Sequence, residues 1–228
     1  MNFQDKNPIK RALFWLALSI TALVVYLVIS NTGGSYFHVI ERGRDLKWNW
    51  DSKLLGILFS ICAMITLVVI AKFKFSDFGF TLKQRKDSLL TALIVSLVVV
   101  GAVWAYAFAI SEARIASPEE LLFQAIMPGL DEELFFRGVL LLIINQAFQP
   151  RWRLLGAKIG LGGILISAFF GFGHGMGFQD GQFVFDFVTI GITGGLAFYL
   201  FWLRERTGSL LLPVILHNVI NVGFSLIG

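Results

Sequence analysis

Residues 131–144 have the sequence DEELFFRGVLLLII, in which three acidic side chains and one arginine come directly before an apolar run. A charged side chain near the centre of a lipid bilayer costs roughly 2.5–3.5 kcal/mol, so this stretch requires internal partners or water. Glu133 and Arg137 are four residues apart on the expected helix and can form an ion pair. Glu132 is turned by about 100° from Glu133 and is expected to be the available carboxylate. The alternative is that the cluster lies at the membrane surface, where water solvates its charges.

The composition of the whole chain is that of a membrane protein. Of its 228 residues, 56% are hydrophobic and 15% are charged, whereas a soluble domain carries about 25% charged residues. Because backbone groups inside lipid must satisfy their own hydrogen bonds, apolar segments of about 20 residues are expected to be helices. We therefore predict one all-α, membrane-embedded domain over residues 1–228, a polytopic bundle of about seven transmembrane helices. The expected spans are 12–31, 54–71, 88–110, 119–147, 158–174, 183–203 and 208–227.

Two segments are expected to depart from simple spans. Residues 72–87 mix Phe with Lys and Arg, which suits a segment lying along the membrane interface. A continuous helix over 119–147 would be about 43 Å long, which exceeds a hydrocarbon core of about 30 Å. Pro128 and Gly129 are therefore expected to break it. Residues 118–127 would then lie at the interface or re-enter the membrane as an eighth segment, and the spanning helix would begin near Asp131.

The distribution of Lys and Arg predicts the orientation, because these residues favour cytoplasmic loops. They are concentrated near the N-terminus and in the loops after the second, fourth and sixth expected spans. We predict an integral protein of the plasma membrane with a cytoplasmic N-terminus and with membrane lipid as a partner. The net charge of +4 is modest, and no nucleic-acid partner is expected. The single cysteine, Cys62, offers neither a disulfide pair nor a metal framework.

Two further motifs place histidines inside expected spans. Phe170-Gly-Phe-Gly-His174 ends the fifth span among glycines, which let neighbouring helices approach closely. In the last span, His217 and Asn221 are four residues apart and share a helix face. Taken alone, each motif is more typical of structural hydrogen bonding between helices. Together with Glu132 they supply a carboxylate base, two imidazoles and an amide donor, a set that can direct water against a carbonyl group.

The three motifs resemble, in the same order, those of the CAAX protease and bacteriocin-processing family, which includes type II CAAX prenyl endopeptidases. The matching motifs are Glu132-Glu133-xxx-Arg137, Phe170-xxx-His174 and His217-xxx-Asn221. The resemblance covers residues 117–225 and implies that this region is the catalytic core of an intramembrane protease. It also implies that Glu133 and Arg137 act as a supporting pair. The implied substrate is a membrane-bound or prenylated protein or peptide.

The resemblance implies a role for each of the remaining motif residues. Glu132 would activate a water molecule for attack on the scissile carbonyl, and Asn221 would stabilise the developing oxyanion. His174 and His217 would orient the water or hold a metal. With Glu132 as a third ligand, the histidines approximate the two-His, one-carboxylate set of a catalytic zinc site. In a metal-free mechanism, Glu132 is the base and the imidazoles form hydrogen bonds, and the sequence leaves both mechanisms open.

The sequence lacks the motifs of two other hydrolase classes. It contains no HExxH motif, which excludes a standard zincin helix, and no GxSxG-like context for a nucleophilic serine. A bacteriocin self-immunity or scaffold protein without proteolytic activity is the main alternative, with the polar residues used only for packing. A small transporter would predict inverted repeats between the two halves, and the sequence has none.

Overall fold

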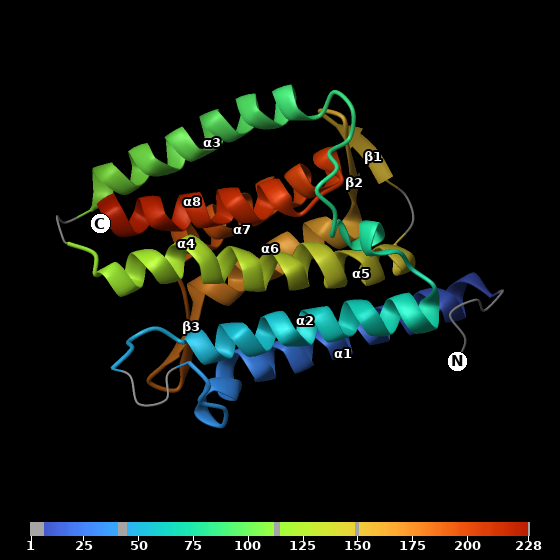
Figure 1. Ribbon diagram of the computed structural model, residues 1–228, viewed down its shortest axis with the longest axis horizontal. Helices are drawn as coiled ribbons and strands as arrows, with labels where there is room; N and C mark the ends of the chain where they lie inside the picture. Colours follow the sequence, from blue (N-terminus) through green and yellow to red (C-terminus); the bar gives the residue numbers. More distant parts are fainter. Residues whose placement is uncertain (1–6, 41–44, 112–114, 149–150, 228) are drawn as a thin grey trace.

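The computed structural model describes residues 7–40, 45–111, 115–148 and 151–227, and these form a bundle of long helices (Figure 1). The helices are α1 (Pro8–Thr32), α2 (Trp50–Ala71), α3 (Leu89–Ile110), α4 (Pro118–Glu132), α5 (Leu141–Ala147), α6 (Leu161–Gly175), α7 (Phe187–Thr207) and α8 (Leu211–Ile227), with the 3-10 turns η1 (Gly33–Ser35) and η2 (Phe75–Phe78). A π-helical segment, η3 (Glu133–Leu140), joins α4 to α5. The prediction of a mostly helical bundle is confirmed.

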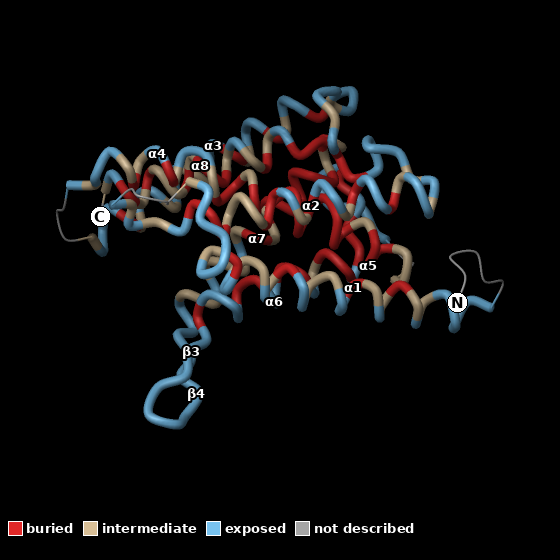
Figure 2. The backbone as a smooth tube through the Cα atoms, turned by 60° about the horizontal axis from the view of Figure 1, so that its bottom comes forward, coloured by how far each residue is buried: buried red, intermediate tan, exposed pale blue. Residues whose placement is uncertain are grey.

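Two short antiparallel hairpins interrupt the helices, so the all-α prediction was wrong in this detail. They are β1 (Arg151–Leu154) with β2 (Ala157–Gly160), and β3 (Met176–Gln179) with β4 (Gln182–Phe185). In both two-residue turns, Leu155-Gly156 and Asp180-Gly181, each residue has a positive φ, as the tight turns of hairpins require. Figure 2 shows the β3–β4 hairpin projecting from the bundle with its surface exposed.

The helix break expected at Pro128 and Gly129 does not occur. Pro128 lies inside α4, and the chain continues through η3 into α5 along one axis (Figure 1). The backbone N–H of Gly129 donates to Oδ1 of Asn218 on α8 at 2.8 Å. This contact joins α4 to α8 directly beside the proline. Residues 118–127 are therefore part of this long helix and do not form a separate re-entrant segment.

Among the described residues, four helical segments are long and apolar enough to cross a membrane. They are Pro8–Ser35, Trp50–Ala71, Leu89–Ile110 and Phe187–Thr207. The apolar helices α6 and α8 are shorter, with 15 and 17 residues. On α3, large side chains such as Leu97 and Phe108 are exposed, which suits contact with lipid. The count of about seven spans is not confirmed, and it stays a prediction together with the single domain and the orientation of the N-terminus.

Helix α7 lies closer to the C-terminus than the predicted span 183–203. Asp186 caps its first turn and accepts a hydrogen bond from the backbone N–H of Thr189 at 3.1 Å. Hydrogen bonds from Thr189 lower the pKa of this carboxyl below its usual range. Gly208 ends the helix in the left-handed conformation, with φ 79°. As a result Arg204, which was expected in a loop, lies in the last turn of the helix.

One end of the bundle, called here the basic end, gathers the start of α1, residues 72–88, residues 151–160 and residues 204–210. The rings of Trp15 and Phe73 lie 5.9 Å apart, and the N–H of Arg85 donates to the carbonyl of Thr207 at 2.7 Å. These loops are the ones whose basic residues predicted the cytoplasmic side. Other basic residues behind that prediction, Lys6, Arg42, Arg44 and Arg114, lie outside the described residues. The position of residues 72–87 at a membrane interface stays a prediction.

Candidate active site

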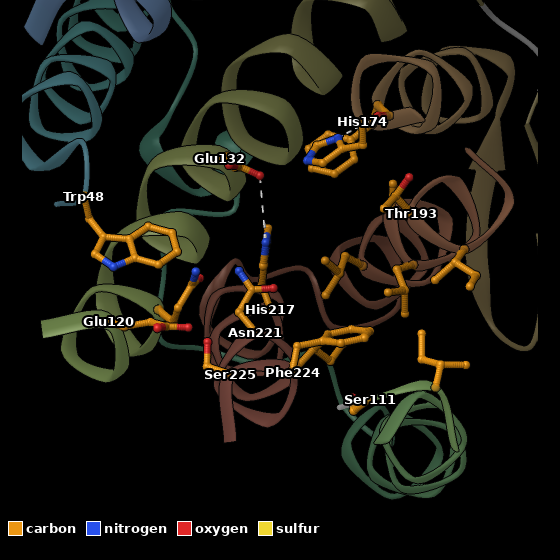
Figure 3. A pocket seen from close by; sticks show the side chains of 18 residues that line it. Trp48, Ser111, Glu120, Glu132, His174, Thr193, His217, Asn221, Phe224 and Ser225 are labelled. Atoms are coloured by element: carbon orange, nitrogen blue, oxygen red, sulfur yellow. Dashed lines mark hydrogen bonds and ion pairs between the residues drawn. The ribbon is translucent and has the colours of Figure 1, made fainter. Parts of the chain in front are cut away.

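A cavity of about 630 Å³ opens between α4, α6, α7 and α8, and its walls hold four of the six predicted site residues. These are Glu132, His174, His217 and Asn221. Figure 3 shows Glu132, His174 and His217 directed into one shared space, with Asn221 one helical turn beyond His217. The other two predicted residues, Glu133 and Arg137, do not line the cavity and are buried behind it, with exposures of 0% and 1%.

Glu132 is not the unpaired carboxylate that was expected. Its Oε1 accepts a hydrogen bond from Nζ of Lys53 in the first turn of α2, at 2.6 Å. Its Oε2 faces the other way and lies 3.8 Å from Nε2 of His217. Lys53 also lies 3.1 Å from Oδ2 of Asp131, which accepts a hydrogen bond from the hydroxyl of Tyr26 at 2.9 Å. Lys53 of α2 therefore holds the Glu132 carboxylate that α4 presents to the cavity, while Tyr26 of α1 bonds the neighbouring Asp131.

Sequence reasoning missed Lys53 and Tyr26. Both lie in the first half of the chain, where no motif pointed to the site. One signal was available, since three adjacent acidic residues with a single arginine leave two carboxylates in need of a cation. The sequence cannot say which of the basic residues supplies it, because the pairing joins positions 79 residues apart.

Glu133 and Arg137 form the predicted ion pair, with Nη1 3.0 Å from Oε1. The same Oε1 also accepts a hydrogen bond from Nδ1 of His217 at 2.8 Å. Arg137 donates from Nη2 to the carbonyl of Ala197 on α7 at 3.0 Å, and its guanidinium lies 5.1 Å from the ring centre of Phe170. A single carboxylate oxygen thus links η3 to α8, and through Arg137 to α7. This pair supports the cavity wall without touching the cavity.

Both cavity histidines have one ring nitrogen fixed by an acceptor. The Nδ1 of His174 lies 2.8 Å from the carbonyl of Phe170, and the Nδ1 of His217 lies 2.8 Å from the Glu133 carboxylate. A carbonyl and a carboxylate can only accept, so each Nδ1 must carry the hydrogen. In the neutral ring, Nε2 then has a free lone pair. Among the described residues, no hydrogen bond is made to either Nε2. Each imidazole can therefore accept a proton or a hydrogen bond from a molecule in the cavity.

The two asparagines of α8 have different surroundings. Asn218 accepts from Gly129 and donates to the carbonyl of Ile126 at 3.4 Å, so it joins α8 to α4. Asn221 lines the cavity, and its amide has no hydrogen-bond partner in the part of the chain that the structure describes. The structure therefore distinguishes Asn218, which packs α8 against α4, from Asn221, which faces the cavity.

The residues present do not fit a bound metal ion well. Within the described ranges, no group of three His, Cys, Asp or Glu residues is arranged so that it could hold one. The expected carboxylate ligand, Glu132, is already bound by the ammonium group of Lys53, which competes electrostatically with a metal cation.

In a comparison with family models, residues 117–223 match the model described as "Type II CAAX prenyl endopeptidase Rce1-like". Neither a search of curated proteins nor a search of solved structures found a match. The matched region begins at the residue that caps α4, contains all six predicted site residues and excludes Lys53 and Tyr26. With four helices apolar and long enough to cross a membrane, the chain is an integral membrane protein. Residues 117–223 are therefore similar to the Rce1-like family of type II CAAX prenyl endopeptidases, a family of membrane proteases.

Proposed function

We propose that the protein is an intramembrane endopeptidase that hydrolyses a peptide bond near the end of a prenylated, membrane-associated substrate. One observation carries the proposal: a single cavity holds a carboxylate, two imidazoles and a carboxamide whose reactive atoms face the same space. The volume of about 630 Å³ lies in the range of ligand sites, and apolar side chains such as Leu196 and Phe224 complete its walls. An immunity or scaffold protein would use the polar groups for packing, which leaves the position of Asn221 unexplained.

In the proposed reaction a water molecule lies between Glu132 and the Nε2 atoms of the two histidines. Glu132 takes a proton from this water as its oxygen attacks the scissile carbonyl carbon. The Asn221 amide donates a hydrogen bond to the oxyanion that forms, where charge develops in the transition state. The proton on Glu132 then passes to the leaving amine as the carbon–nitrogen bond breaks. The Glu133–Arg137 pair holds His217 in the tautomer that this role requires.

The function is tested with the purified full-length protein and a synthetic peptide ending in a prenylated CAAX sequence. We expect release of the C-terminal peptide after the modified cysteine, detected by mass spectrometry, with one atom of water oxygen in the new carboxylate. An unprenylated peptide of the same sequence is the matched substrate control, and we expect it to be cleaved more slowly. If no peptide bond is broken by protein that is folded and monodisperse, the proposed function is wrong.

We infer that the mechanism is metal-free, because Lys53 occupies the position of a cation beside Glu132. Removal of metals by a chelator is therefore expected to leave the cleavage rate unchanged, with the metal content of the treated protein measured directly. A loss of activity that one equivalent of zinc restores would contradict this inference, while leaving the protease function intact.

Lys53 is expected to act as a positioning residue for Glu132. In Lys53→Met the carboxylate loses its 2.6 Å contact, and kcat should fall by up to roughly 10²-fold, as small misplacements of reacting groups do. KM should change little, because Lys53 does not line the cavity. Lys53→Arg retains the charge and should recover most of the rate. A Lys53→Met enzyme with wild-type kcat, or an Arg variant as slow as the Met variant, would count against this role.

A further inference from the structure

A second cavity, of about 550 Å³, lies at the basic end of the bundle, between residues 73–85, α5, β1 and the end of α7. Its charged lining residues are Asp77, Lys83, Arg85, Arg151, Arg204 and Glu205. The cations outnumber the carboxylates by four to two. Along α7, the lining of the first cavity extends to Leu200, and Arg204 of the second cavity lies one helical turn further on, about 6 Å away at roughly 1.5 Å per residue. The two cavities share no lining residue, so the second is not part of the candidate active site.

Arg204 is a buried arginine in this cavity that has no ion pair among the described residues. It is 6% exposed, and its Nη2 donates to the backbone carbonyl of Asp77 at 2.7 Å. Its buried Nε has no hydrogen-bond partner, and no carboxylate among the described residues lies within ion-pair distance of it. Gly79, with φ 77°, packs against the guanidinium so closely that any side chain there would overlap it. Glu205 and Asp77 attract the guanidinium electrostatically, but neither forms an ion pair with it in the part of the chain that the structure describes. Arginine is rarely buried without a directly paired anion, so this position can accept one.

The two carboxylates in the lining attract Arg204 without pairing with it directly. Oδ2 of Asp77 accepts a hydrogen bond from the backbone N–H of Lys74 at 2.8 Å. Oε2 of Glu205 lies 4.0 Å from Nη1 of Arg151, a long separation for an ion pair. Arg85 donates to the backbone carbonyl of Glu205 and makes no ion pair with a described carboxylate. Three guanidinium groups therefore face one polar cavity with an excess of positive charge.

We propose that this cavity binds the phosphate group of an anionic ligand through Arg85, Arg151 and Arg204. Guanidinium groups match the geometry of phosphate oxygens and form short, charge-assisted hydrogen bonds with them. The cavity lies between helix ends and loops, where basic pockets of membrane proteins accept phospholipid headgroups. A free phosphate anion offers the same chemistry. The phosphate group would complete the charge balance of Arg204 and would connect the β1–β2 hairpin to α7.

Binding is measured by calorimetric titration of the full-length protein in a zwitterionic detergent. The probes are a short-chain phosphatidylglycerol, inorganic phosphate and a short-chain phosphatidylcholine. We expect saturable binding of phosphatidylglycerol or of inorganic phosphate, and weaker binding of the zwitterionic lipid. Binding of the anionic lipid alone identifies a headgroup as the ligand, and equal binding of both anions identifies free phosphate. If neither anionic probe binds, the proposal is wrong.

Arg151→Gln and Arg204→Gln are each expected to weaken binding at least tenfold. Arg153→Gln is the matched control, because Arg153 lies on the same strand as Arg151, is exposed and does not line the cavity. If Arg204→Gln does not fold, Arg151→Gln decides the question, since Arg151 lies on an exposed strand. Equal weakening by Arg151→Gln and Arg153→Gln would mean that the anion follows general surface charge, and it would overturn the assignment. The measurement does not depend on proteolysis and stands apart from the proposed function.

Discussion

Glu132→Gln is expected to lower the rate of peptide hydrolysis by roughly 10²- to 10⁴-fold, the range that a general base contributes. Glutamine has the same size as glutamate, and its amide oxygen can still accept the hydrogen bond from Lys53. It cannot take a proton from water at neutral pH. The loss should therefore appear in kcat with little change in KM, which initial-rate measurements over a range of substrate concentrations will separate.

Asp180→Asn is the matched control for this prediction, because it makes the same change from carboxylate to amide at an exposed position. Asp180 lies in the turn between β3 and β4 with φ 50°, a conformation that asparagine also adopts readily. We expect wild-type rates from this variant. If Glu132→Gln cleaves the substrate as fast as the wild type, Glu132 is not the base and the mechanism has to be assigned again.

Arg137→Met is expected to destabilise the folded protein by about 3–5 kcal/mol, the cost of removing one partner from a buried ion pair. Glu133 would be left fully buried, with only His217 as a partner, and the hydrogen bond from Arg137 to the carbonyl of Ala197 would be lost. Unfolding of the purified protein in mixed micelles, followed by circular dichroism during titration with a denaturing detergent, measures the change in free energy of unfolding.

The double variant Glu133→Gln/Arg137→Met separates the ion pair from simple packing. Because this variant removes both charges, its loss of unfolding free energy should be smaller than the summed losses of the two single variants. Arg153→Met serves as the control, since Arg153 is exposed and should change stability by less than about 0.5 kcal/mol. An Arg137→Met protein as stable as the wild type would show that the buried pair does not hold η3, α7 and α8 together.

The parts of the fold and site that the sequence predicted are those governed by local spacing. The Glu133–Arg137 pair follows from a four-residue interval on one helix, and the structure confirms it. His174 and His217 were predicted as site residues because histidines are rare inside apolar spans. Both line the same cavity. Their catalytic roles stay predictions.

The parts that the sequence did not predict depend on contacts between distant segments. Beside Pro128, the Gly129 amide of the continuous helix α4 is bonded by Asn218, 89 residues further along the chain. The local rule that proline breaks a helix does not hold at this position. The pairing of Lys53 with Glu132 is also a contact between distant segments. No periodic pattern in the sequence relates the first turn of α2 to the end of α4. In contrast, Asp180-Gly181 is a local hairpin signal that could have been recognised from the sequence.

The ammonium group of Lys53 lies outside the region that matches the family model, although it binds a carboxylate inside that region. The match covers residues 117–223, yet the cation that compensates Asp131 and Glu132 comes from α2, outside it. A fragment starting at α4 would hold two neighbouring carboxylates in an apolar setting without this compensation. The proposed site therefore includes a contact from α2, which lies outside the region of sequence similarity.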